Sequence, residues 1–133
     1  MVNTMGSRMI YDYARKFGFG IRTGVALPSE TSGVLREYEK WNKLSGPMVS
    51  IGQEISINTL QLAIAYSSIA NGGYLPSARI VKNISGNGYE RRDYSPKPIR
   101  RVVSKETAIK IKLIMEDVVN KGCLLYTSPS PRD

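Results

Sequence analysis

The chain has 133 residues, no histidine, a single cysteine and a formal net charge of +8, from 19 Lys and Arg against 11 Asp and Glu. This composition excludes histidine-dependent acid–base chemistry, Ser-His-Asp and Cys-His catalysis, an intrachain disulfide and the common zinc sites. A hydrophobic content of 41% is sufficient for a packed core, but no apolar run is long enough to cross a membrane and the N-terminal residues lack the pattern of a signal peptide.

The first predicted element is a helix over Ser7–Phe17. Ser7 is a residue type that caps helix N-termini, and Gly18 stands where a left-handed residue commonly ends a helix. Apolar side chains recur on one face at helical spacing, at Met9, Ile10, Tyr13, Ala14 and Phe17. The pattern therefore predicts an amphipathic helix.

The stretch from Phe19 to Gln53 follows neither the period of a strand nor that of a helix, and glycines and prolines interrupt it throughout. This pattern predicts an ordered but irregular segment, called the excursion below. The rings of Tyr38 and Trp41 are expected to hold it against the rest of the domain by burying their surface. A loop of this length inside a compact domain is uncommon and is usually functional or part of something larger.

The strongest predicted helix has Asn58 as its N-cap and ends near Ala70, with Gln61 three residues after the cap as in a capping box. Apolar residues lie on nearly all of its sides, at Leu60, Leu62, Ala63, Ile64, Ala65, Tyr66, Ile69 and Ala70. Such a helix is expected to be buried from several directions. The chain provides few neighbours for it, which indicates a piece of a larger domain.

A β-hairpin follows. Residues 79–84 and 89–94 are rich in β-formers and flank Asn87-Gly88, a dipeptide typical of tight hairpin turns. Residues 99–103 predict a further short strand.

The last predicted element is a helix over Lys105–Lys121. Ser104 is placed to cap it, Glu106 lies in the first turn where the helix dipole favours an acid, and Gly122 ends it. Its expected inward face comprises Ala108, Ile111, Met115 and Val118 or Val119.

The basic residues gather between positions 79 and 105. This segment holds Arg79, Lys82, Arg91, Arg92, Lys97, Arg100, Arg101 and Lys105 against Glu90 and Asp93. One interpretation is a contact surface for an anionic polymer or a membrane. The other is a solvated hairpin and linker, which is the usual role of a charge run. The segment lacks the interleaved aromatics expected of a platform that binds single-stranded nucleic acid, and no nucleic-acid partner is expected.

Residues 123–133 read Cys-Leu-Leu-Tyr-Thr-Ser-Pro-Ser-Pro-Arg-Asp. This string resembles the in-frame translation of a transposase sequencing adapter, and every residue matches. We therefore expect residues 1–122 to be the natural part, from an assembled environmental sequence, and the remainder to be an adapter-derived, disordered tail. Met1 is expected to be an arbitrary start.

The residues themselves form no complete catalytic constellation. The carboxylates Glu30, Glu37, Glu39 and Glu54 are scattered, and their spacing does not pair them for acid–base chemistry. No phosphate loop, dinucleotide fingerprint or metal-ligand spacing occurs, so no cofactor and no metal are expected. Pattern and composition alone predict part of an α/β or α+β domain without a complete active site.

Three strings resemble a known family. They are Phe17-Gly18-Phe19-Gly20 with Thr23-Gly24, Leu27-Pro28, Glu30 and Gly33; Ser50-Ile51-Gly52-Gln53 with Ile55-Ser56 and Thr59-Leu60-Gln61-Leu62-Ala63; and Ala65-Tyr66 with Ile69-Ala70-Asn71-Gly72-Gly73. Together they resemble the transpeptidase domain of class B penicillin-binding proteins, the peptidoglycan D,D-transpeptidases, and most of all its division-specific branch. The resemblance extends over 1–122, and the first two strings disfavour a β-lactamase or β-lactam sensor.

The resemblance implies an α/β (α+β) sandwich of the penicillin-recognising serine transpeptidase type, of which this chain holds mostly the helical part plus short strands. Members of the family cross-link peptidoglycan stem peptides through an acyl-serine intermediate and are β-lactam targets. The implied parent is anchored in the bacterial inner membrane with this domain on the periplasmic side, and it meets membrane-embedded divisome proteins.

The family's catalytic motifs are expected to lie outside this chain. No Ser-x-x-Lys and no Lys-Thr-Gly occurs in it, and the family order places Ser-x-Asn before Met1 and Lys-Thr-Gly after Gly122. Ser56-Ile57-Asn58 and Ser85-Gly86-Asn87 match Ser-x-Asn by letters only, because the first begins a helix and the second is a hairpin turn. The chain is therefore predicted to be inactive, with no catalytic residue. The alternative is a small basic interaction module that binds an anionic polymer or a membrane through 79–105.

Two positions depart from the family pattern. Glu54 stands where members often have glycine, and Thr59 where they often have proline. Thr59 is compatible with a helix start, and Glu54 is interpreted as a solvated surface residue in a loop near the family's cleft. The two hypotheses differ in one structural expectation. An internal piece of a domain should leave Leu62, Tyr66 and Ile69 without enough partners, whereas an independent module should close its core.

Overall fold

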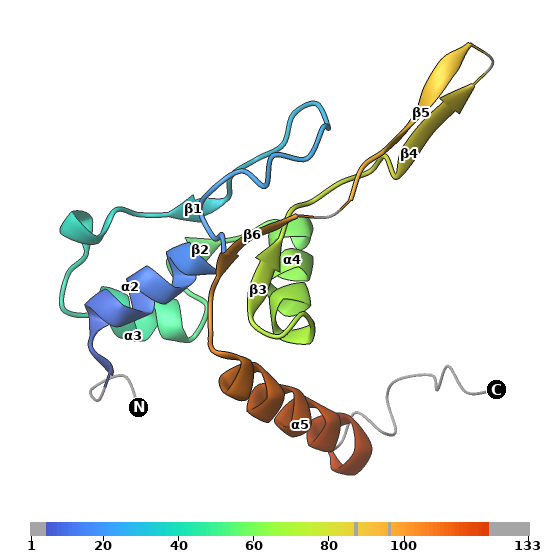
Figure 1. The fold of residues 1–133 in the computed structure, drawn as a ribbon. Helices are drawn as coiled ribbons and strands as arrows, with labels where there is room; N and C mark the ends of the chain where they lie inside the picture. The colour runs from blue at the N-terminus through green and yellow to red at the C-terminus, as the bar shows by residue number, and fades with distance from the viewer. Residues whose placement is uncertain (1–4, 87, 96, 123–133) are drawn as a thin grey trace.

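The computed structural model describes residues 5–86, 88–95 and 97–122. The predicted tail, 123–133, and Asn87 of the second Ser-x-Asn match lie outside these residues. Figure 1 shows the elements in chain order: α2 (Ser7–Lys16), β1 (Val34–Leu35), the 3₁₀ helix η1 (Tyr38–Lys40), α3 (Ser45–Ser50), β2 (Ile55–Ser56), α4 (Thr59–Ala70), β3 (Tyr74–Pro76), β4 (Asn83–Gly86), β5 (Tyr89–Asp93), β6 (Pro98–Arg101) and α5 (Lys105–Lys121).

The strands form three small antiparallel sheets in the described part of the chain. β1 pairs with β2, β3 with β6, and β4 with β5. Mixed helices with small antiparallel sheets agree with the predicted α+β class. None of the described helices combines the length and the apolar character needed to cross a membrane.

Helix α2 lies close to its predicted bounds, but its start differs. Gly6 is the N-cap and no side chain caps this end, so the prediction of Ser7 as the cap was wrong. Ser7 instead packs against Gly46 of α3, where an added Cβ would overlap the Ser7 side chain. Gly18 adopts the expected left-handed conformation, with φ of 93°.

The excursion after α2 is mostly irregular, as predicted, and an aromatic cluster holds it to α2. The ring of Tyr11 lies 5.6 Å from that of Trp41, edge to face, and 5.9 Å from that of Tyr38. The indole nitrogen of Trp41 also donates a hydrogen bond of 3.0 Å to the carbonyl oxygen of Arg36. The predicted role of Tyr38 and Trp41 is therefore confirmed.

Helix α4 begins with the predicted capping box, in which Asn58 and Gln61 each bond the backbone of the other. Its apolar sides, which the sequence pattern predicts to be buried from several directions in a complete domain, are only partly covered by the described elements. Leu62 is 39% exposed and Tyr66 is 55% exposed, while Ile69 is half-buried. The described elements beside α4 cover only part of its apolar surface, which is the outcome expected of an internal piece.

The predicted hairpin is present as β4 and β5, with the first strand starting at Asn83 rather than at Arg79. It extends away from the helices in Figure 1. The predicted strand near 99–103 is β6, and its partner β3 was not predicted.

Helix α5 has the predicted bounds, and the hydroxyl of Ser104 accepts a hydrogen bond of 3.1 Å from the amide of Thr107. Of the expected inward face, Ala108 is buried and Ile111 is half-buried. Met115, Val118 and Val119 are exposed, contrary to the prediction. Helix α5 contacts α4, but a groove remains between the two helices, and Met115 and Val119 line it.

Candidate functional site

The first two strings of the family resemblance meet at one buried side-chain amide, that of Gln61, which is 1% exposed. Its nitrogen donates hydrogen bonds of 2.8 Å to the carbonyl oxygens of Ile21 and Ser32, with a longer contact of 3.4 Å to that of Gly18. Its oxygen accepts a bond of 3.0 Å from the amide of Asn58. Gln61 thus joins the end of α2, the glycine-containing excursion and the start of α4.

Asn58, the last residue of the first Ser-x-Asn match, has a structural role. Its side-chain oxygen accepts a hydrogen bond of 2.7 Å from the backbone amide of Gln61, and its side-chain nitrogen donates one of 2.7 Å to the carbonyl of Thr31. Ser56 lies in β2 opposite Val34. Ser85 and Gly86 of the second match lie in β4. Neither match is part of a catalytic arrangement among the described residues.

Two glycines of the resemblance strings allow close backbone contacts. A Cβ on Gly33 would overlap the carbonyl of Ser56, and a Cβ on Gly73 would overlap the carbonyl of Val103. Both residues have left-handed φ values, of 65° and 91°. Glycine is required at these two positions by conformation and by space.

Glu30 closes the loop that contains Thr23 and Gly24. Its carboxylate accepts from the Thr23 amide at 2.6 Å and from the Gly24 amide at 3.2 Å. The hydrogen bond from the Thr23 side chain, followed by that from the Thr23 amide, lowers the pKa of Glu30 below its ordinary value. The carboxylate therefore acts as a fixed hydrogen-bond acceptor that holds the loop.

Glu54 forms an ion pair with Arg36, so the interpretation of a simply solvated residue was incomplete. The Arg36 guanidinium also donates to the hydroxyl of buried Ser45 at 3.1 Å. Glu54 has a φ of 59°, in the left-handed region. This conformation favours glycine, which gives a physical reason for the glycine that the family resemblance places here.

The other two carboxylates also have partners of their own. Glu37 accepts a bond of 2.9 Å from the hydroxyl of Tyr11, and this bond, followed by burial, raises the pKa of Tyr11. Glu39 lies 3.9 Å from the guanidinium of Arg8. No cluster of three acidic, histidine or cysteine side chains suited to a metal ion occurs within the described ranges.

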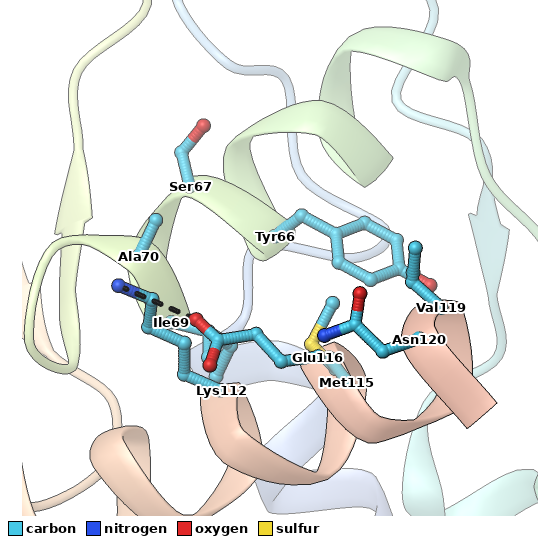
Figure 2. A pocket seen from close by; sticks show the side chains of 9 residues that line it. All are labelled: Tyr66, Ser67, Ile69, Ala70, Lys112, Met115, Glu116, Val119 and Asn120. Carbon is cyan, nitrogen blue, oxygen red and sulfur yellow. Dashed lines mark ion pairs between the residues drawn. The ribbon is translucent and has the colours of Figure 1, made fainter. Parts of the chain in front are cut away.

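A large apolar groove lies between α4 and α5 (Figure 2). It has a volume of about 630 Å³ and is lined by Tyr66, Ser67, Ile69, Ala70, Lys112, Met115, Glu116, Val119 and Asn120. Lys112 and Glu116, 3.8 Å apart, form an ion pair among the lining residues, and the ring of Tyr66 lies between the two helices. On the other side of Tyr66, Phe17, Phe19 and Leu62 help to line a second hollow of about 240 Å³.

Two basic residues of the 79–105 segment have structural roles that the sequence did not reveal. Arg100 donates to the carbonyls of Lys16 and Arg15, at 2.9 and 3.0 Å, and so holds β6 to the end of α2. Arg101 lies over the ring of Tyr74, 4.2 Å from its centre, and donates to the tyrosine hydroxyl. A charge run carries no signal for such contacts, because they depend on which strand pairs with which.

This chain is similar to proteins of known family. The family model of the penicillin binding protein transpeptidase domain matches residues 1–128, a range that passes the predicted boundary at 122. The chain is 36% identical to the penicillin-binding protein PbpB of Mycolicibacterium smegmatis over 122 residues, which is 91% of this chain and 19% of the relative. It is 30% identical to the probable peptidoglycan D,D-transpeptidase PenA of Neisseria flavescens over 113 residues, covering 85% of this chain and 26% of the relative.

Solved structures agree. Penicillin binding protein 3 of Mycobacterium tuberculosis, complexed with ampicillin, has a TM-score of 0.79 at 34% identity and covers 95% of this chain and 26% of its own. A peptidoglycan synthetase from Bifidobacterium adolescentis has a TM-score of 0.84 at 29% identity, covering 94% of this chain and 23% of its own. The chain spans about a fifth of the length of the first curated relatives that it matches. It belongs to the penicillin-binding protein transpeptidase family.

Proposed function

We propose that this chain is an internal segment of the transpeptidase domain of a peptidoglycan D,D-transpeptidase, and that it is inactive by itself. The parent enzyme would cross-link stem peptides through an acyl-serine intermediate. The observation that carries the proposal is the family match over residues 1–128 of a chain that contains neither Ser-x-x-Lys nor Lys-Thr-Gly.

The exposed groove between α4 and α5 supports the proposal. Apolar side chains that gather on one exposed surface can mark a region that another part of the protein covers. Tyr66 and Met115, at 55% and 39% exposure, would be covered in the complete domain. In the complete domain this segment would have a structural role. The hydrogen bonds of Gln61 order the loops, and α4 and α5 form the two sides of the groove.

The remaining properties are proposals about the parent. The relatives of this chain include probable peptidoglycan D,D-transpeptidases, a stage V sporulation protein of Bacillus subtilis and a protein solved in complex with ampicillin, which supports stem peptides and β-lactams as ligands of the parent. We place the parent at the inner membrane with this domain on the periplasmic side, in contact with divisome proteins. Residues 1–122 would be its natural part and 123–133 the adapter-derived tail.

The basic-module alternative gains no support from the arrangement of the 79–105 segment. Arg100 and Arg101 are engaged with α2 and Tyr74, and Arg91 is paired with Asp93. The core is also not closed around α4. Binding of the chain to vesicles with anionic headgroups tests the basic-module alternative, and we expect this binding to be weak.

A chimera tests the proposed function. Residues 1–122 replace the aligned segment of Mycolicibacterium smegmatis PbpB, and covalent binding of labelled penicillin is measured by gel fluorescence. We expect labelling of the chimera, because the relative supplies the three catalytic motifs around this segment. A chimera without the relative's nucleophilic serine is the control and should stay unlabelled. A chimera that folds, by circular dichroism, and is not labelled would contradict the proposal.

A further inference from the structure

We propose that the β4–β5 hairpin is a docking element for an extended, acidic segment of a partner protein, which adds to the hairpin as a third strand. The proposal is independent of the groove between α4 and α5. It rests on the isolation of the hairpin, on the side chains that share one of its faces and on a hollow in that region.

The hairpin is a two-stranded sheet without further strands among the described residues. Each of its outer edges therefore presents backbone N–H and C=O groups that have no strand beside them. An isolated two-stranded hairpin is only marginally stable in water, and a third strand stabilises it. Strand addition is a common way in which such an edge binds an extended peptide.

One face of the hairpin combines cations with apolar side chains. Ile84 lies opposite Arg92 in the register, and the amide of Tyr94 donates to the carbonyl of Lys82 at 2.9 Å. Because side chains alternate between faces, Lys82, Ile84, Arg92 and Tyr94 share one face. Ile84 is 51% exposed and Tyr94 is 40% exposed, although both are large apolar residues.

The two cations on this face are available for a partner. Within the described ranges neither Lys82 nor Arg92 forms an ion pair, whereas Arg91 is bound to Asp93 at 3.1 Å. A hollow of about 470 Å³ lies beside Ile84, Arg92 and Tyr94, with Glu90 and Arg91 as its other lining residues. Since Arg91 is paired with Asp93, the remaining charges of this lining are Arg92 and Glu90, and Lys82 adds a second cation to the face.

These features favour an acidic protein segment over a lipid surface. A strand next to β4 would place its alternate side chains opposite Lys82 and Ile84, and an acid followed by an apolar residue complements that order. A membrane would not satisfy the backbone groups of the open edges, which are costly in hydrocarbon. The partner is therefore expected to contribute an extended segment in which acidic and apolar side chains alternate on one face.

The test titrates the full 133-residue chain with a labelled peptide and measures fluorescence anisotropy. The probe peptide carries glutamate and valine in turn at every second position, separated by threonine. Control peptides have lysine in place of glutamate, or N-methylated backbone amides on the pairing edge. The matched variants are Lys82→Glu on the hairpin and Lys110→Glu on α5, which change the net charge equally. Vesicles of phosphatidylglycerol test the lipid alternative.

We expect the glutamate peptide to bind, with an affinity that falls as salt rises and is lost on N-methylation. Lys82→Glu should weaken binding by about tenfold or more, while Lys110→Glu should change it by less than about twofold. Backbone amides of Asn83–Gly86 should gain protection from hydrogen exchange in the complex. Absence of binding, equal binding of the lysine peptide, an equal effect of the two variants, or binding to vesicles alone would each overturn the proposal.

Discussion

The side-chain amide of Gln61 donates a hydrogen bond of 2.8 Å to the carbonyl oxygen of Ser32, which lies 29 residues earlier in the chain. This bond and its counterpart to Ile21 connect the excursion to α4 from inside the protein, where water does not replace them. A buried amide that satisfies carbonyls from two segments contributes more to stability than an exposed hydrogen bond, because its loss leaves those carbonyls without partners.

Replacing this amide should be strongly destabilising. Gln61→Leu removes the donor to the carbonyls of Ile21 and Ser32 and half of the capping box, and we expect the free energy of unfolding to fall by about 3 kcal/mol. Urea unfolding of the full chain, followed by circular dichroism, measures the loss. An unchanged unfolding midpoint would show that water reaches these carbonyls.

Gln61→Glu provides a matched test with a pH signature. The carboxylate keeps an acceptor for the Asn58 amide but faces the carbonyls of Ile21 and Ser32, so burial and repulsion should raise its pKa in the folded state. A raised folded-state pKa stabilises the protein below the unfolded value and loses that contribution as the pH rises. The variant should therefore approach the wild type in stability at acidic pH and be weakest at neutral pH.

Two neighbouring glycines in the turn after α4 allow the steric effect of an added Cβ to be distinguished from the cost of a left-handed backbone. Gly72 and Gly73 both have left-handed φ values, but a Cβ at Gly72 meets nothing within 4 Å, whereas one at Gly73 overlaps the carbonyl of Val103. Gly72→Ala should cost about 1 kcal/mol, from backbone strain alone. Gly73→Ala should cost about 3 kcal/mol, because the backbone at Val103, two residues after β6, must also shift. Equal unfolding midpoints for the two variants would contradict this contact.

Glu54 allows the cost of its conformation to be measured. Glu54→Ala removes the ion pair with Arg36 and keeps a side chain at a φ of 59°, whereas Glu54→Gly removes the pair and relieves the backbone. Since a partly exposed ion pair contributes little, the glycine variant should be more stable than the alanine variant by about 1 kcal/mol. Thermal unfolding of both variants measures this order, and the reverse order would show that the position carries no strain.

Glu30 should make stability depend on pH in the acidic range. Its pKa is below the ordinary value of 4.5 in the folded chain, so its stabilising contribution is present above that value and is lost as the pH falls through the folded pKa. Glu30→Gln should flatten the dependence of the unfolding midpoint on pH below about 4.5. Thr23→Val, which removes the largest cause of the shift, should flatten it in part. If both variants kept the wild-type dependence of the unfolding midpoint on pH, Glu30 would not contribute to it.

The sequence was informative where a signal is local. The capping box at Asn58, the cap at Ser104 and the β4–β5 hairpin depend on signals a few residues apart, and the structure has both caps and the paired strands. It was less informative where the outcome depends on distant segments. Glycines predicted the turn after α4, but nothing in the local pattern predicted that Gly73 lies under Val103 or that β3 pairs with β6.

The same distinction explains the error at α5. Its pattern predicted an inward face that includes Met115 and Val118 or Val119, because periodicity reports which residues can be buried and not what covers them. Tyr66 and Val119 line the groove between α4 and α5 and remain exposed there. For the same reason the position of Gln61 was predicted from its capping role, while its contacts with Ile21 and Ser32 were not.

Covalent labelling of the chain itself tests the central claim most directly. The purified 133-residue chain and penicillin binding protein 3 of Mycobacterium tuberculosis, which has been solved with ampicillin, are incubated with the same penicillin and compared by intact-mass spectrometry. The account predicts an acyl adduct on the relative and an unchanged mass for this chain, because the chain has no Ser-x-x-Lys nucleophile. A stoichiometric adduct mapped to a serine of this chain would contradict it.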